Sequence, residues 1–239
     1  MILKVKGMTN ETDYLSRRVR MFDGDNAYTA LKSCRDALFE PITMPQAINA
    51  PPLTPLYQSI RNHGATTTIS LKATGLSKAG NRVVVYAHIA DHFFSKPKNI
   101  LSYTIQNMAE KPGKMPGHTF NSLLTREDNK TVLVIDHKLF FSGKYKFNYT
   151  EALKNPRLVA ACGGENGIEE LFKYTSEVIF HQYCDHEAFR RQYSALWRFI
   201  AIGPSYVAET SVNYPHCFIG LETPEANLKS ELEEEVLLD

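Results

Sequence analysis

The sequence has few cysteines, no paired metal-ligand motif and no long hydrophobic run. Its four cysteines are widely spaced among 239 residues and form no C-x-x-C pair, which argues against a zinc ribbon and a disulfide-rich scaffold. No apolar run approaches the roughly 18 residues of a transmembrane helix, and the first ten residues lack a signal-peptide pattern. We therefore predict a cytoplasmic protein with reduced thiols, no membrane association and no cofactor.

The length and composition predict a folded protein with a sizeable core. Hydrophobic residues make up 43% of the 239 residues. Residues 40–56 hold five prolines, so neither a regular helix nor a central strand can run through them. We predict a single α+β domain over residues 1–221, with a candidate sub-boundary at 40–56, followed by an acidic tail at 222–239.

The net charge of +1 conceals an uneven distribution of charged residues. Residues 1–150 hold 20 Lys and Arg against 11 Asp and Glu, whereas residues 151–239 hold 7 against 15. The tail at 222–239 has seven acids and one lysine, a net charge of −6, which leaves +7 on residues 1–221. A basic body with an acidic end is typical of proteins that bind polyanions.

Residues 130–149 are predicted to form a β-hairpin at the centre of the fold. The apolar run 132–135 has the length and β-branched content of a buried strand. Ser142 and Gly143 are candidates for a two-residue turn. In the return strand, lysines and aromatic residues alternate with the period of two that places them on opposite faces.

The remaining elements complete an α+β fold. We predict an antiparallel sheet built on the 130–149 hairpin, with helices before it and a helical C-terminal third. Trp197 should pack in the core, because it shares the apolar face of a helix predicted at 186–202. Other predicted helices cover 26–39, 149–161 and 167–182, and a helical turn covers 57–63. The predicted strands outside the hairpin cover 2–5, 65–74, 81–90, 205–212 and 216–221. Residues 100–108 fit either a strand or a helix.

One candidate site combines basic and aromatic residues on the predicted hairpin. Lysines interleaved with aromatic rings are typical of surfaces that bind single-stranded nucleic acid, where cations follow the phosphates and bases stack on the rings. Three arginines within four residues near the N-terminus add a second basic cluster. Solvated lysines with core-facing rings are the alternative interpretation. The predicted nucleic-acid-binding residues are Arg17, Arg18, Arg20, Lys130, Lys138, Lys144, Tyr145, Lys146 and Phe147.

A second candidate site is a set of histidines and aspartates that follow predicted strands: His88, Asp91, His92, His118 and Asp136. Their order resembles the metallo-β-lactamase family, whose members assemble a two-metal hydrolase site from such residues. The family's first motif is H-x-H-x-D-H, and Ala87 and Ile89 stand here where its first two histidines belong. The alternative interpretation is that these histidines bind no metal and only form ordinary hydrogen bonds within the fold.

These patterns favour a non-enzymatic protein that binds RNA or single-stranded DNA on its basic face. The acidic tail at 222–239 is expected to compete with nucleic acid or to bind protein partners, unless it forms an ordinary terminal helix. Two alternatives stay open: a metal-dependent hydrolase that uses the histidine and aspartate set, and a structural subunit of a larger assembly.

Overall fold

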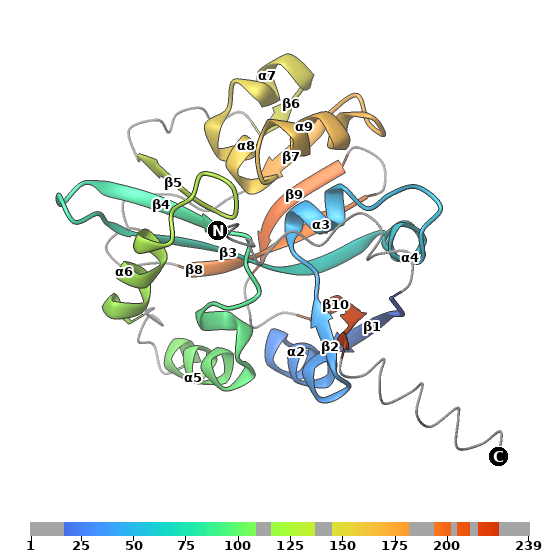
Figure 1. Ribbon diagram of the computed structural model, residues 1–239, viewed down its shortest axis with the longest axis horizontal. Coiled ribbons are helices and arrows are strands. Elements are labelled where there is room, and N and C mark those ends of the chain that lie inside the picture. The colour runs from blue at the N-terminus through green and yellow to red at the C-terminus, as the bar shows by residue number, and fades with distance from the viewer. Residues whose placement is uncertain are drawn as a thin grey trace, which may run out of the picture.

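Strand β3 (Ala65–Leu76) lies at the centre of a large mixed sheet (Figure 1). Its sequence, ATTTISLKATGL, is rich in β-branched residues, which favour extended backbone. Strands β4, β8 and β10 all pair with it. The structure is a computed structural model that describes residues 17–108, 116–136, 145–181, 194–201, 205–210 and 215–224.

Helices and strands alternate irregularly along these residues. The sheet is formed by β1 (Val19–Gly24), β2 (Phe39–Pro41), β3, β4 (Arg82–Ala87), β5 (Val132–Asp136), β6 (Lys146–Phe147), β7 (Val178–His181), β8 (Ser194–Ile200), β9 (Ser205–Thr210) and β10 (His216–Glu222). The helices are α2 (Ala27–Asp36), α3 (Met44–Ile48), α4 (Pro55–His63), η1 (Phe93–Ser95), α5 (Pro97–Met108), α6 (Gly117–Thr125), α7 (Tyr149–Leu153), α8 (Pro156–Ala161) and α9 (Glu165–Phe172).

The strands pair in an order that departs widely from their order in the sequence. The main path runs β1-β10-β3-β8-β9-β7-β6, with β2 added on β10, β4 on β3 and β5 on β4. Two pairings, β10 with β3 and β7 with β9, are parallel, so the sheet is mixed rather than antiparallel as predicted. Strands from before and after the proline-rich segment belong to this one sheet.

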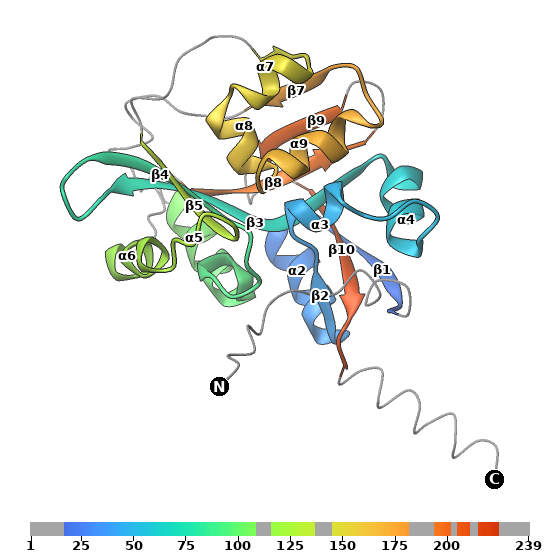
Figure 2. The same cartoon turned by 45° about the horizontal axis from the view of Figure 1, so that its top comes forward.

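Helices cover both faces of the sheet. Helices α3, α4, α7, α8 and α9 pack on one face, whereas α2, α5 and α6 pack on the other (Figure 2). Strand β4 shows why both faces are apolar: Val84 and Tyr86 belong to one core cluster, and Val83 and Val85 belong to the other. A strand covered on both sides needs a continuous apolar run, and RVVVYA supplies it.

The proline-rich segment folds into short elements that its sequence encodes locally. Pro45 and Pro55 occupy the first turns of α3 and α4, where a missing backbone N–H costs nothing. Thr43 and Thr54 cap the two helices, and Gly64 ends α4 with a φ of 70°. No central strand crosses this segment, as predicted, but the prediction that it holds no regular helix is wrong, because α3 and the start of α4 lie within it.

The predicted central hairpin at 130–149 is not confirmed. Strands form at both of its ends, but β5 pairs with β4 and β6 pairs with β7, toward different edges of the sheet. Residues 137–144, including the predicted turn, lie outside the described residues. Alternation in sequence predicts a strand but not its partner, because the partner is chosen by packing with distant segments.

The predicted helical C-terminal third is not confirmed, because α7, α8 and α9 are followed by the strands β7, β8, β9 and β10. The helix predicted at 167–182 ends at Phe172 and gives way to β7, and part of the helix predicted at 186–202 is strand β8. In β8 nearly every side chain is buried, so an apolar run covered on both faces was mistaken for a helical stripe. Trp197 is fully buried, as predicted, although it lies on a strand.

Several local predictions are confirmed. Helix α2 falls within 26–39, α4 includes 57–63, β3 and β4 pair as expected, and β9 and β10 match the two final strands. Residues 97–108, part of which fitted a helix or a strand, form α5. The predicted strand at 2–5 and the tail beyond 224 lie outside the described residues. Among the residues that are described, no helix has the length and hydropathy that a bilayer crossing requires.

Candidate functional site

The three N-terminal arginines are engaged within the protein. The Nε of Arg17 donates to the carbonyl oxygen of Glu222 at 2.7 Å, and the Nε of Arg18 lies 3.9 Å from the carboxylate of the same residue. Arg20 lies over the ring of Phe22 on β1, 5.3 Å from its centroid. Glu222, predicted to begin a separate tail, is therefore the buried last residue of β10.

The basic and aromatic residues of the predicted hairpin form no common face with these arginines. Strand β6 lies at the opposite end of the sheet from β1. Phe147 is buried, Tyr145 is 57% exposed, and the ammonium of Lys146 lies 3.4 Å from the carboxylate of Glu177. Lys130 is in the turn that leads to β5, where its backbone N–H donates to Asp128. Lys138 and Lys144 lie outside the described residues.

The histidine and aspartate set does not converge on a common point. Both ring nitrogens of His88 have partners, the Ser70 hydroxyl at 2.8 Å and the Ala160 carbonyl oxygen at 2.7 Å. Both ring nitrogens of His92 also have partners: Nε2 contacts the carbonyl oxygen of Ile69, and Nδ1 accepts from the backbone N–H of Phe94. Burial lowers the pKa of both histidines to about 4, so both rings are neutral at pH 7.

The other members of this set lie elsewhere. His118 is exposed in the first turn of α6, Asp91 pairs with Arg126 at 3.9 Å, and Asp136 ends β5. Within the described ranges, no three His, Cys, Asp or Glu side chains gather in a way that could hold a metal ion. The two buried histidines therefore hold loops to β3 and do not form a hydrolase site.

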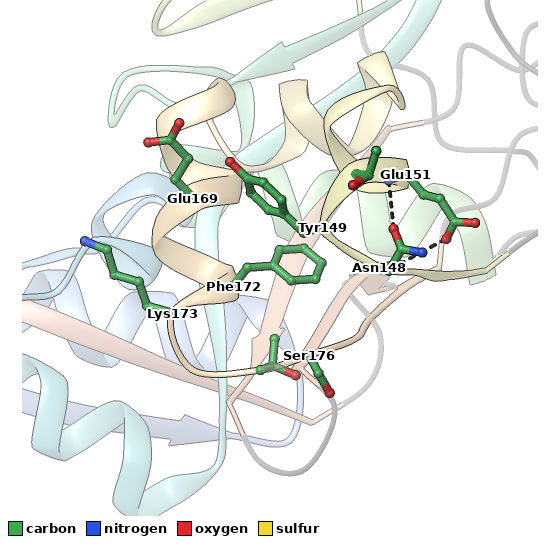
Figure 3. Close-up of a pocket in the computed structure, with 9 residues that line it drawn as sticks. Asn148, Tyr149, Glu151, Glu169, Phe172, Lys173 and Ser176 are labelled. Atoms are coloured by element: carbon green, nitrogen blue, oxygen red, sulfur yellow. Dashed lines mark hydrogen bonds between the residues drawn. The ribbon is translucent and has the colours of Figure 1, made fainter.

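The structure instead presents a hollow between α7 and α9, with a volume of about 700 Å³ (Figure 3). Tyr149 and Phe172 lie in its middle, while Glu169 and Lys173 project from α9 at one side. The residues that line it are Asn148, Tyr149, Thr150, Glu151, Glu169, Phe172, Lys173, Thr175 and Ser176.

Local sequence builds the α7 wall of this hollow. The side chain of Asn148 accepts a hydrogen bond from the backbone N–H of Glu151 at 3.0 Å, and the Glu151 carboxylate accepts from the N–H of Asn148 at 3.1 Å (Figure 3). This reciprocal capping box starts α7 at Tyr149.

The floor of the hollow is aromatic. Tyr149 meets the ring of Phe172 edge-on, with 5.6 Å between centroids and 69° between planes. Such an arrangement places the positive edge of one ring on the negative face of the other. Phe172 is half-buried beneath it, whereas Tyr149 is 41% exposed and available to a ligand.

The two charged side chains of α9 at the hollow, Lys173 and Glu169, differ in whether they form an ion pair with a described residue. Lys173 pairs with Glu170 at 2.5 Å, and this hydrogen bond raises the pKa of the lysine. Glu169 is exposed, and no described residue makes a hydrogen bond or ion pair with it. An exposed ring and an exposed carboxylate thus line the same hollow, and both can contact a ligand.

Two further hollows are less suited to a ligand. One, of about 740 Å³, lies between α2 and α5, where Lys32 and Asp36 already neutralise each other. The other, of about 540 Å³, lies where β10 begins and includes Arg198 and Cys217. Burial raises the pKa of the Cys217 thiol to about 12, so the thiol stays protonated and is a poor nucleophile.

A solved structure is similar to this chain. It comes from work on the "accommodation of massive sequence variation in Nanoarchaeota by the C-type lectin fold". The similarity has a TM-score of 0.69 and 27% sequence identity, and it covers 87% of this chain and 99% of that one. The fold is similar to the C-type lectin fold. Searches of protein-family models and of curated proteins find no match.

This similarity corrects the functional prediction. The C-type lectin fold is not typical of nucleic-acid binding, and the described members of the predicted basic and aromatic set are divided between opposite ends of the sheet. The prediction that the chain binds RNA or single-stranded DNA is therefore wrong. The hollow was missed because residues 144–149 were interpreted as one strand, although the Asn148 and Glu151 spacing is a recognisable helix start.

Proposed function

We propose that the chain is a binding protein that uses a fold similar to the C-type lectin fold as a rigid scaffold for a changeable surface. The similarity to the nanoarchaeal study's structure, which spans 99% of that chain, carries this proposal. That structure concerns a fold that accommodates massive sequence variation, and we extend this property to the present chain.

The hollow between α7 and α9 is the surface that we propose for binding. Its side chains divide into those that build the fold and those that only face solvent. Thr150, Glu169, Lys173 and Ser176 are exposed, whereas Ile168 and Leu171 on the same helix are buried in the core. Substitutions at exposed positions usually change stability by less than about 0.5 kcal/mol, so ligand contacts can change here without loss of the fold.

Two matched libraries test the proposal. One randomises Thr150, Glu169, Lys173 and Ser176 together, and the other randomises the four core positions Ala160, Ile168, Leu171 and Phe199. Both are displayed on yeast and challenged with protease. We expect most members of the first library to survive and few members of the second.

Binding is tested by selecting the surviving hollow library against one purified protein that the parent chain does not bind, such as lysozyme. We expect binders whose selected residues lie at the four randomised positions. Survival as poor as that of the core library, or no binders after repeated selection, would contradict the proposal.

A further inference from the structure

We infer that the hollow between α7 and α9 binds an arginine side chain on the surface of a partner protein. The inference rests on the proposed function, because it assigns a ligand class to the same hollow. Three features carry it: the charge of the described lining, the exposed ring of Tyr149, and a comparable contact elsewhere in the molecule.

Among the residues that the structure describes, the lining of the hollow has a net negative charge. It includes the carboxylates of Glu151 and Glu169 and the ammonium of Lys173, which sum to −1. Lys173 forms its ion pair with Glu170, outside the lining, and also interacts electrostatically with Glu169. A cation is attracted to such a site, whereas a phosphate or carboxylate is repelled.

The ring of Tyr149 adds a second attraction for a cation. A guanidinium within about 6 Å of an aromatic centroid is attracted by the negative face of the ring, and its planar shape stacks well there. Tyr149 is 41% exposed, with Phe172 packed against its ring. Figure 3 shows Glu169 on α9 at the side of the hollow toward which the phenol oxygen of Tyr149 points. One guanidinium can therefore stack on the ring and approach the carboxylate.

Two of the other polar groups of the hollow have partners within the protein. The side-chain oxygen of Asn148 accepts from the backbone N–H of Glu151, and the hydroxyl of Thr175 donates to the carbonyl oxygen of Glu177 at 2.7 Å. These two groups are therefore less available to a ligand than the exposed ring of Tyr149 and the carboxylate of Glu169.

The same molecule already stacks a guanidinium on neighbouring tyrosines. Arg61 lies 4.9 Å from the ring centroid of Tyr174 and 5.3 Å from that of Tyr57. Tyr174 follows α9 directly, so this contact lies close in sequence to the hollow. The hollow has a ring of the same type, and none of its described lining residues is an arginine. Its volume of about 700 Å³ exceeds one side chain and suits a protein loop that carries an arginine.

Titration of the isotope-labelled full chain with acetyl-arginine-amide tests this inference. We expect amide shifts at Tyr149, Glu169 and Phe172, with a dissociation constant on the order of millimolar, as suits one ion pair and one ring contact. Acetyl-citrulline-amide has the same shape without the charge, and it should bind roughly tenfold more weakly. Added salt should weaken arginine binding but not citrulline binding.

Three variants locate the contact. Glu169→Gln and Tyr149→Leu should each weaken arginine binding about five- to tenfold, while thermal melts confirm that they fold. Glu165→Gln, an exposed position on α9 outside the hollow, should leave binding unchanged. Equal binding of arginine and citrulline, an unaffected Glu169→Gln variant, or stronger shifts with methyl glucoside would overturn the inference. Any of these results would overturn the arginine inference alone, and the proposed function would still hold if the hollow library survives protease. Failure of that library would instead overturn the proposed function.

Discussion

The Nδ1 atom of His88 lies 2.8 Å from the hydroxyl oxygen of Ser70, and this hydroxyl also accepts the backbone N–H of Met44 at 2.7 Å. The Nε2 of the ring lies 2.7 Å from the carbonyl oxygen of Ala160. A neutral ring that donates from Nε2 and accepts at Nδ1 satisfies every one of these contacts. The ring thereby ties α3 and α8 to the central strand.

Acidification is expected to destabilise the protein between about pH 6.5 and pH 4. Burial lowers the pKa of His88 and His92 to about 4, whereas the unfolded chain has the ordinary value of 6.5. Above pH 6.5 both states are neutral, so the two histidines add no pH dependence there. Below it the unfolded state binds more protons, and each histidine lowers stability by about 1.4 kcal/mol per pH unit until the folded pKa is reached.

Urea denaturation at pH 7, 5.5 and 4.5 measures this effect. The variant His88→Gln should show a smaller pH dependence than the parent, because one of the two titrating groups is absent. Equal unfolding free energies at pH 7 and pH 4.5 would count against this account of the buried histidines.

Trp197 is expected to be the side chain most sensitive to truncation. Its ring is stacked between Tyr86 and Phe180, with 5.8 Å between centroids on each side. Trp197→Ala should reduce the unfolding free energy by about 3–5 kcal/mol, measured by circular dichroism because the chain has a single tryptophan.

The conservative change Trp197→Phe should cost far less, about 1–2 kcal/mol. The indole N–H is buried, and no group in the described part of the chain accepts its hydrogen bond, so phenylalanine removes an unsatisfied donor while it keeps most of the stacking. If both variants lose equal stability, ring stacking is not the main contribution of this residue.

Gly163 should not tolerate a side chain. Its φ is 82°, and an added Cβ would lie 2.4 Å from the Cγ of Pro45, whose ring cannot move aside easily. Gly163→Ala should therefore lower stability by about 1–3 kcal/mol. Gly117 begins α6 with no atom near its missing Cβ, so Gly117→Ala should be neutral or slightly stabilising. Thermal melts of the two variants side by side decide the matter, and equal melting temperatures would refute it.

Arg61 is expected to require a guanidinium and not merely a positive charge. Its Nη1 donates to the carbonyl oxygen of Ala201 at 2.8 Å while the same group stacks on Tyr57 and Tyr174. Arg61→Lys should cost about 1–2 kcal/mol, because a lysine cannot stack and donate in this geometry. Arg126→Lys, at an exposed position, should cost less than about 0.5 kcal/mol in the same denaturation assay. If Arg61→Lys and Arg126→Lys lowered the unfolding free energy by similar amounts, the stacking of Arg61 on the tyrosines would have no special role in stability.

Local patterns in the sequence predicted many elements but fewer of their contacts. Helix α2 and the paired strands β3 and β4 follow from short-range periodicity and from a connection short enough to allow pairing. The capping box that starts α7 was equally local and could have been recognised. By contrast, β8 was mistaken for a helix, since a strand buried on both faces has no alternation to reveal it.

The sequence by itself determined where Trp197 would lie, because a large apolar residue in an apolar run is buried whether the backbone is a helix or a strand. It also encoded the starts of the short helices in the proline-rich segment, because the capping residues Thr43 and Thr54 and the prolines that follow them are local signals. Only the tertiary structure decided that β5 pairs with β4 while β6 pairs with β7, and that Tyr149 meets Phe172 beside Glu169. Those contacts join segments whose separation along the chain carries no local signal, and they form because burial of both sheet faces selects one arrangement of the whole chain.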